Sequence, residues 1–294
     1  MLDNHHICDF TVFNTSFEPF NYLGHRDKQV IRQCLQNFST AIALARSDKK
    51  VPKILETGAG LSTVIFSKLL TYPDESIKTI DAFSNEAIKI NSRGASDHFR
   101  MSDLHNCEVI QGVTIDEKEL TDFYQSPHST LISLPPKDML AHLDMFLNFN
   151  MDDRKNQKIA TLLNLPYFNA EVLKRYFMEN SLFENELIRS FKTSEDEFHF
   201  LKNNTAKPKL RELLQNYQPN IIYLDSGEYS TNIEFNIIDA FSEKGTILIV
   251  QDIFFPKSIK SFFIASAIMS SDRWRTLWID KTTPQGMIVC KKES

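Results

Sequence analysis

The chain has 294 residues, which is long for one domain and short for two large ones, so we expect one α/β core with an additional segment. The net charge of −5 disfavours a general nucleic-acid-binding surface, and no apolar run reaches the length of a membrane span. The N-terminus lacks a basic region followed by an apolar one, and the four cysteines form no Cys-x-x-Cys pair. These features predict a soluble cytoplasmic protein with reduced thiols and no membrane partner.

The first fifty residues predict an N-terminal cap followed by a helix. Residues 1–24 contain many aromatic side chains without a clear period, which either pack over the core or line a substrate pocket. Residues 25–47 place apolar side chains at helical spacing. This helix leads directly into the first strand.

A buried strand, a tight turn and a helix N-terminus are predicted over residues 54–63, Ile-Leu-Glu-Thr-Gly-Ala-Gly-Leu-Ser-Thr. Gly58 and Gly60 permit positive φ and a close approach of a ligand. Glu56 at the end of the strand suits a ligand that carries an ammonium group, whereas the absence of a following Lys excludes a P-loop. Ser62 stands where a dinucleotide fingerprint has its third glycine. The alternative is a glycine turn that binds no ligand.

This stretch resembles motif I of the class I S-adenosylmethionine-dependent methyltransferases, in particular the small-molecule branch with Ser-Thr after the second glycine. The resemblance implies that the turn faces the methionine part of S-adenosylmethionine. It also implies that Glu56 supports the ammonium group of the cofactor, directly or through water. The residues thereby assigned to the cofactor are Glu56, Thr57, Gly58, Ala59, Gly60, Ser62 and Thr63.

The second strand, residues 77–81, ends in Asp81 about twenty residues beyond the glycines, which is the separation expected for a ribose-binding carboxylate. Ala82 beside it, and Gly112 at the end of a third strand over residues 107–112, are further candidate cofactor residues. Residues 85–91 between these strands have a helical pattern. Related enzymes often carry an acid beside the adenine after the third strand, which this chain lacks there, so adenine recognition stays unassigned.

Residues 115–218 predict a helical insertion, because a crossover to the next strand needs far fewer residues. It begins on the ligand face of the sheet and is interpreted as a lid or a partner subdomain. Within it, Asn164–Tyr167 resembles the Asn-Leu-Pro-Tyr motif of adenine N6-methyltransferases. The acidic composition and a better fourth strand downstream favour a chance match, and nucleic acid is not the expected partner.

The fourth and fifth strands, residues 219–225 and 246–252, both end in acids. The fourth is similar to motif IV of the same branch, so Asp225, Glu228 and Asp252 are candidate catalytic bases, and Asp225 is also a candidate cofactor residue. A buried cap is the alternative for Asp225. Related metal-dependent O-methyltransferases hold a divalent cation here, but Gln251 is a weaker ligand than an acid, so the pattern favours a site without a metal.

The last two strands, residues 273–279 and 286–291, are separated by too few residues for a parallel crossover and must form a hairpin. The predicted fold is therefore α/β, with a doubly wound, seven-stranded, mostly parallel sheet whose last strand is antiparallel. Residues 51–114 and 219–294 form the S-adenosylmethionine-binding core, and residues 115–218 interrupt it between the third and fourth strands.

The function implied is an S-adenosylmethionine-dependent methyltransferase that methylates oxygen or nitrogen of a small molecule. One alternative is a non-catalytic protein of the same fold whose insertion binds a partner. A second is a nucleic-acid N-methyltransferase that uses Asn164–Tyr167. Homo-oligomerisation stays open.

Overall fold

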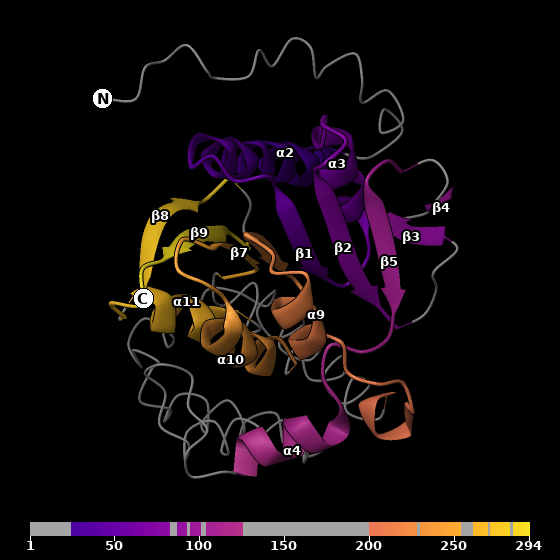
Figure 1. Ribbon diagram of the computed structural model, residues 1–294. Coiled ribbons are helices and arrows are strands. Elements are labelled where there is room, and N and C mark those ends of the chain that lie inside the picture. The colour runs from indigo at the N-terminus through magenta and orange to yellow at the C-terminus, as the bar shows by residue number, and fades with distance from the viewer. Residues whose placement is uncertain are drawn as a thin grey trace, which may run out of the picture.

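The computed structural model describes residues 25–82, 87–92, 95–100, 104–125, 200–227, 230–253, 261–269, 271–282 and 285–294. Seven strands form the main sheet in the order β5-β2-β1-β6-β7-β9-β8 (Figure 1). Their bounds are β1 Lys53–Thr57, β2 Ser76–Asp81, β5 Cys107–Gln111, β6 Ile221–Leu224, β7 Ile247–Gln251, β8 Trp274–Asp280 and β9 Met287–Lys292.

Strand direction in this sheet confirms the predicted fold class. β1 pairs in parallel with β2 and with β6, β2 pairs in parallel with β5, and β6 pairs in parallel with β7. β9 is antiparallel to both β7 and β8, as the predicted terminal hairpin requires. The sheet is thus doubly wound and mostly parallel, with its last strand reversed.

Helices cover both faces of the sheet (Figure 1). α2 (His25–Ser47) and α3 (Leu61–Leu69) pack on one face, and α9 (Leu210–Asn216), α10 (Ser230–Phe241) and α11 (Phe262–Met269) pack on the other. Consecutive residues of β1 alternate between the faces, so that Ile54 joins the α2 and α3 cluster whereas Leu55 joins the opposite one.

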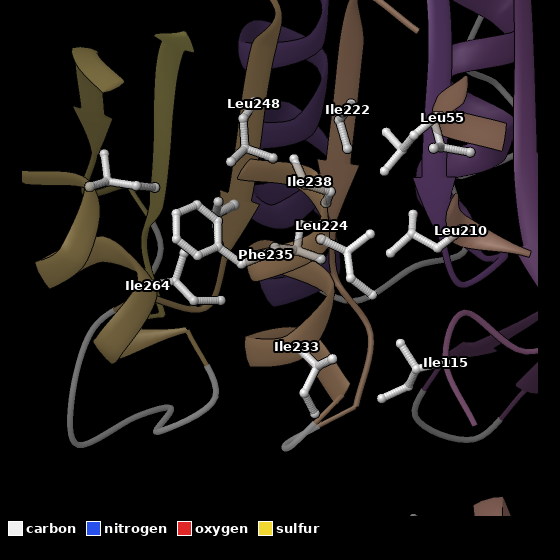
Figure 2. Close-up of a cluster of buried hydrophobic side chains, with 14 of the residues drawn as sticks. Leu55, Ile115, Leu210, Ile222, Leu224, Ile233, Phe235, Ile238, Leu248 and Ile264 are labelled. Atoms are coloured by element: carbon white, nitrogen blue, oxygen red, sulfur yellow. The ribbon is translucent and has the colours of Figure 1, made fainter. Parts of the chain in front are cut away.

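The core on the α10 face draws side chains from elements far apart in the sequence. Figure 2 shows Leu55, Ile222 and Leu248 of three strands facing Phe235 and Ile238 of α10. On the other face, the rings of Phe38 and Phe66 stack with centroids 3.8 Å apart, and Tyr223 contacts Phe38 edge-on. These apolar contacts hold the helices against the strands whose ends form the site.

A second, two-stranded sheet corrects one prediction. β3 (Ala87–Ser92) and β4 (Ala95–Arg100) pair as antiparallel strands, so the helix expected over residues 85–91 is wrong. Ile88 and Ile90 alternate with Lys89 and Asn91, which is the period of a strand, and only two residues separate the strands, as in many hairpins.

The described parts of the predicted insertion belong to the core. α4 (Glu117–Gln125) follows β5, residues 200–203 are helical, and α9 precedes β6. Leu120, Leu201 and Leu210 are all buried in the α10-face cluster. Residues 1–24 and 126–199 lie outside the described residues, so the domain boundaries, the aromatic cap and the lid stay predictions. No helix in the described ranges combines the length and apolar character that would let it cross a membrane.

Candidate active site

The candidate site lies at the carboxyl ends of the parallel strands, where the order of the chain in the sheet reverses. β1 is flanked by β2 on one side and by β6 on the other, so successive crossovers run in opposite directions from β1. In open α/β sheets, ligands bind in the crevice outside such a switch point.

The turn after β1 requires glycine at one position and leaves space at another. Gly58 has φ of 93°, and a Cβ there would lie 3.4 Å from the backbone oxygen of Asp225. Its N–H donates to the Ile80 oxygen at 3.0 Å, which ties the turn to β2. Gly60 has extended backbone, and a Cβ added to it would meet no heavy atom within 4 Å. The space above Gly60 is therefore open to a ligand.

Glu56 lies beneath this turn and is fully buried. Its carboxylate accepts hydrogen bonds from the Ser62 hydroxyl and, at 2.5 Å, from the Thr63 hydroxyl. The Thr63 oxygen also accepts from the Gly60 N–H at 2.9 Å. Burial raises the pKa of Glu56 to about 7, although the hydroxyl hydrogen bonds oppose the shift. Glu56 thus holds the turn in place, and its role toward an ammonium group stays a prediction.

Asp81 joins the ends of three strands. Its Oδ2 accepts from the Ala59 N–H at 3.3 Å, and its backbone oxygen accepts from the Gly112 N–H at 2.9 Å. Together with Gly58, Ala82 and Gly112, it lines a cavity of about 220 Å³. The structure therefore brings four of the predicted cofactor residues to one hollow.

The rest of the cavity wall was not predicted. Its other lining residues are Ile80, Val113, Thr114, Phe200, Leu201, Ser226, Gly227 and Ser230. Phe200 and Leu201 belong to residues 200–209, here called the return segment, which leads from the predicted insertion back toward β6, and no sequence motif connects them to the strand ends.

Gly112 lies where the return segment runs alongside the end of β5. Val113 forms a parallel bridge with Pro208, and the Lys209 N–H donates to the Val113 oxygen at 2.8 Å. A Cβ on Gly112 would lie 2.8 Å from Lys209 Cγ and 3.2 Å from the Lys207 oxygen. Glycine at position 112 therefore permits this contact, because a larger residue would push the segment away.

The ends of β6 and β7 form a second group of polar side chains. The Asp225 N–H donates to the Thr57 hydroxyl at 3.3 Å, which fastens β6 to β1. The Tyr223 hydroxyl lies 3.2 Å from Asp225 Oδ2 and also contacts Gln251 Oε1. Burial, aided by the charge of Asp225, raises the pKa of Tyr223 well above its usual value. Tyr223 thus connects Asp225 with Gln251.

Asp252, another of the three candidate bases, lies at the junction of β7 and the terminal hairpin. It has φ of 61°, and its N–H donates to the Gly286 oxygen at 3.0 Å. Across the described ranges, no group of three or more His, Cys, Asp or Glu side chains is arranged to hold a metal. Glu228 and Asn164–Tyr167 lie outside the described residues.

Comparison with solved structures finds similar proteins at low identity. One is an O-methyltransferase from Bacillus cereus in complex with S-adenosylhomocysteine, with 11% identity, a TM-score of 0.37, and coverage of 97% of this chain and 88% of that chain. Another is the O-methyltransferase TomG from Streptomyces achromogenes in complex with S-adenosylmethionine, with 10% identity, a TM-score of 0.36 and full coverage of both chains. No protein-family model and no curated protein matches the chain.

Proposed function

We propose that this protein binds S-adenosylmethionine and methylates oxygen or nitrogen of a small-molecule acceptor in the cytoplasm. The observation that carries the proposal is that Gly58, Asp81, Ala82 and Gly112 line one and the same cavity at the ends of three adjacent strands. The sequence resemblance assigns these four positions to the cofactor. The reversed β9 supports the same class of fold.

The residues at this edge fit the cofactor in shape and charge. Asp81 faces the cavity with a carboxylate that can accept hydrogen bonds from both ribose hydroxyls. The cavity, at about 220 Å³, is smaller than the roughly 300 Å³ at which sites for drug-sized ligands begin, so it holds only the nucleoside part. The methionine part then lies along the Gly58–Gly60 turn, where the space above Gly60 is open.

The cofactor, when bound, supplies a methyl group activated by a sulfonium. Asp225 lies beside the glycine turn and is the base we assign to the acceptor proton, with the Tyr223 hydroxyl orienting its carboxylate. Displacement of the methyl group depends mainly on positioning, so a base need remove only one proton. Asp252 and Glu228 are the alternative bases.

Calorimetric titration of the protein with S-adenosylmethionine and S-adenosylhomocysteine tests cofactor binding. We expect saturable binding of both, weakened about tenfold or more by Asp81→Asn because its ribose hydrogen bonds are lost. Asp48→Asn changes an exposed carboxylate in the turn after α2 that pairs with Lys291, and should leave the affinity unchanged. The absence of saturable heat with either ligand would overturn the proposal.

Turnover is tested by formation of S-adenosylhomocysteine in the presence of a panel of phenols, alcohols and amines. Asp225→Asn should lower the rate about a hundredfold while S-adenosylhomocysteine still binds, because a base acts on the acceptor and not on the cofactor. Binding without turnover of any acceptor would favour the non-catalytic alternative.

A further inference from the structure

A buried carboxylate on α10 connects two walls of the cavity. Glu234 is fully buried and accepts hydrogen bonds from the hydroxyls of Thr114 and Ser226. Thr114 follows β5 and Ser226 follows β6, and both line the cavity. One buried side chain is therefore hydrogen-bonded to two residues that line the cavity.

The carboxylate determines what these hydroxyls can offer to a ligand. A hydroxyl has one hydrogen and two lone pairs, whereas an ionised carboxylate only accepts hydrogen bonds. Because Glu234 receives the hydrogen of the Thr114 hydroxyl, the Thr114 oxygen presents an acceptor and no donor to the cavity. The Ser226 oxygen also contacts the hydroxyls of Ser230 and Thr231. A ligand edge placed against Thr114 must therefore carry a hydrogen-bond donor.

The position of Thr114 identifies which part of the ligand it meets. Asp81 on β2 is the ribose carboxylate of the proposed function, and β5 is the next strand outward from β2. The cavity lining also includes Val113, Phe200 and Leu201, whose apolar surfaces suit the faces of a flat ring. A nucleobase attached to a ribose at Asp81 therefore has its edge at Thr114.

Resting on the proposed function, we infer that Glu234 and Thr114 select the nucleobase of the cofactor. Thr114, with its hydrogen held by Glu234, accepts a hydrogen bond from the exocyclic amine of adenine and disfavours a base with a carbonyl at that position. This pair takes the place of the carboxylate that the sequence lacks after β5. Glu234 is a positioning residue, since it acts through Thr114.

The test uses calorimetry to compare the affinities of S-adenosylhomocysteine and S-inosylhomocysteine. In the second compound a carbonyl replaces the exocyclic amine of the base. The wild-type protein should prefer the adenosyl compound about tenfold, as expected for one lost hydrogen bond and one unpaired acceptor. The valine side chain in Thr114→Val has nearly the same shape as threonine but no hydrogen-bond acceptor. The ratio of the two dissociation constants should therefore be close to one. In Glu234→Gln, the side-chain amide can donate a hydrogen bond to the Thr114 oxygen. The Thr114 hydroxyl hydrogen is then free to point toward the cavity. The preference for the adenosyl compound should therefore be reduced or inverted.

Asp239→Asn is the matched control. Asp239 is a second buried carboxylate on α10, but it accepts from Trp274 Nε1 and pairs with Arg273, at 2.7 Å each, and does not line the cavity. Its substitution should lower stability and leave the adenosyl preference unchanged. Circular dichroism establishes folding of each variant, and Thr114→Val carries the test if Glu234→Gln does not fold.

The outcomes separate this inference from the proposed function. If the wild-type protein binds neither compound, the proposed function fails and the inference fails with it. If the wild-type protein binds the adenosyl compound and Thr114→Val retains the full preference, the inference alone is overturned.

Discussion

Gly58 and Gly60 are two residues apart in one turn, yet they are glycines for different reasons. Gly58 has positive φ, a conformation that costs other residues about 1 kcal/mol or more. Gly60 has extended backbone and open space around it, so nothing in the folded chain requires glycine there. A ligand that occupies this space would explain the second glycine.

This contrast predicts opposite behaviour of two alanine variants. Gly58→Ala should lose at least about 1 kcal/mol of unfolding free energy. Gly60→Ala should retain its stability within about 0.5 kcal/mol but bind S-adenosylhomocysteine about tenfold more weakly, because the methyl group occupies the path of the ligand. Urea denaturation and calorimetry measure the two quantities. An unchanged affinity in Gly60→Ala would show that the ligand does not approach this residue.

Glu56 predicts a pH dependence of stability with a defined sign. Its pKa in the folded protein is about 7, above the ordinary value of 4.5, so the folded state holds a proton that the unfolded state releases. Its contribution is full below pH 4.5 and is lost as the pH rises through about 7. The stability difference between wild type and Glu56→Gln should fall by about 2 kcal/mol from pH 5 to pH 8 in urea denaturation.

Glu75 supplies the control, because it is also buried but shifted the other way. Burial alone would raise its pKa, yet the Arg46 guanidinium at 2.7 Å and the N–H groups of Tyr72 and Thr71 outweigh burial and lower it. Its contribution is present above pH 4.5 and is lost only as the pH falls further. The difference between wild type and Glu75→Gln should therefore stay constant from pH 5 to pH 8. A parallel fall in both variants would refute the assignment to Glu56.

Among the elements around the site, the return segment at residues 200–209 is held by tertiary contacts with the end of β5. It lies against the end of β5 through the Lys209 N–H and the close approach to Gly112. Phe200 and Leu201 of the same segment line the cavity. The attachment at Lys209 thus joins this part of the cavity wall to the end of β5.

Gly112→Ala should loosen this segment without unfolding the sheet. The added methyl group forces Lys209 and the Lys207 backbone apart from β5, at a cost of about 1–2 kcal/mol. Hydrogen exchange of the Lys209 N–H should accelerate, while that of central β1 amides stays slow. Adding Lys209→Ala removes the closest atom and should restore part of the protection. Unchanged exchange at Lys209 in Gly112→Ala would contradict this account.

The elements that sequence reasoning located are those with strong local signals. The Gly58–Gly60 turn, the acid that ends β2 and the short terminal hairpin each follow from spacing along the chain, and the structure contains all three. β3 was missed although Ile88 and Ile90 recur at the period of a strand, because the run is short and its partner β4 lies in a polar stretch. Phe200 and Thr114 could not be predicted as neighbours, since only the folded chain brings them together.

Over the whole molecule, a buried polar network connects α2 with β8, although Asn37 and Asp280 are 243 residues apart in the sequence. The Asn37 amide donates to Asp280 Oδ2 at 2.6 Å, and its oxygen accepts from Trp278 Nε1 at 2.6 Å. Asn37 is fully buried, so each of these groups depends on its partner in place of water. The network fixes the helix before β1 against the far end of the sheet.

Asn37→Leu should therefore destabilise the molecule by about 2–4 kcal/mol, because the indole N–H and the Asp280 carboxylate each lose a partner. Thr40→Ala on the exposed face of the same helix removes one hydrogen bond, to the Gln36 oxygen, and should cost less than about 0.5 kcal/mol. Urea denaturation of both variants measures the difference. Equal losses would mean that the network contributes no more than a surface contact.

The place of β9 constrains how the molecule can assemble as it is synthesised. β8 is made before β9, but its pairing partner in the sheet is β9, which in turn pairs with β7. When the apolar strand Trp274–Asp280 leaves the ribosome, its docking position has not yet been built. The sheet can therefore be completed beyond β7 only after Met287–Lys292 has been synthesised.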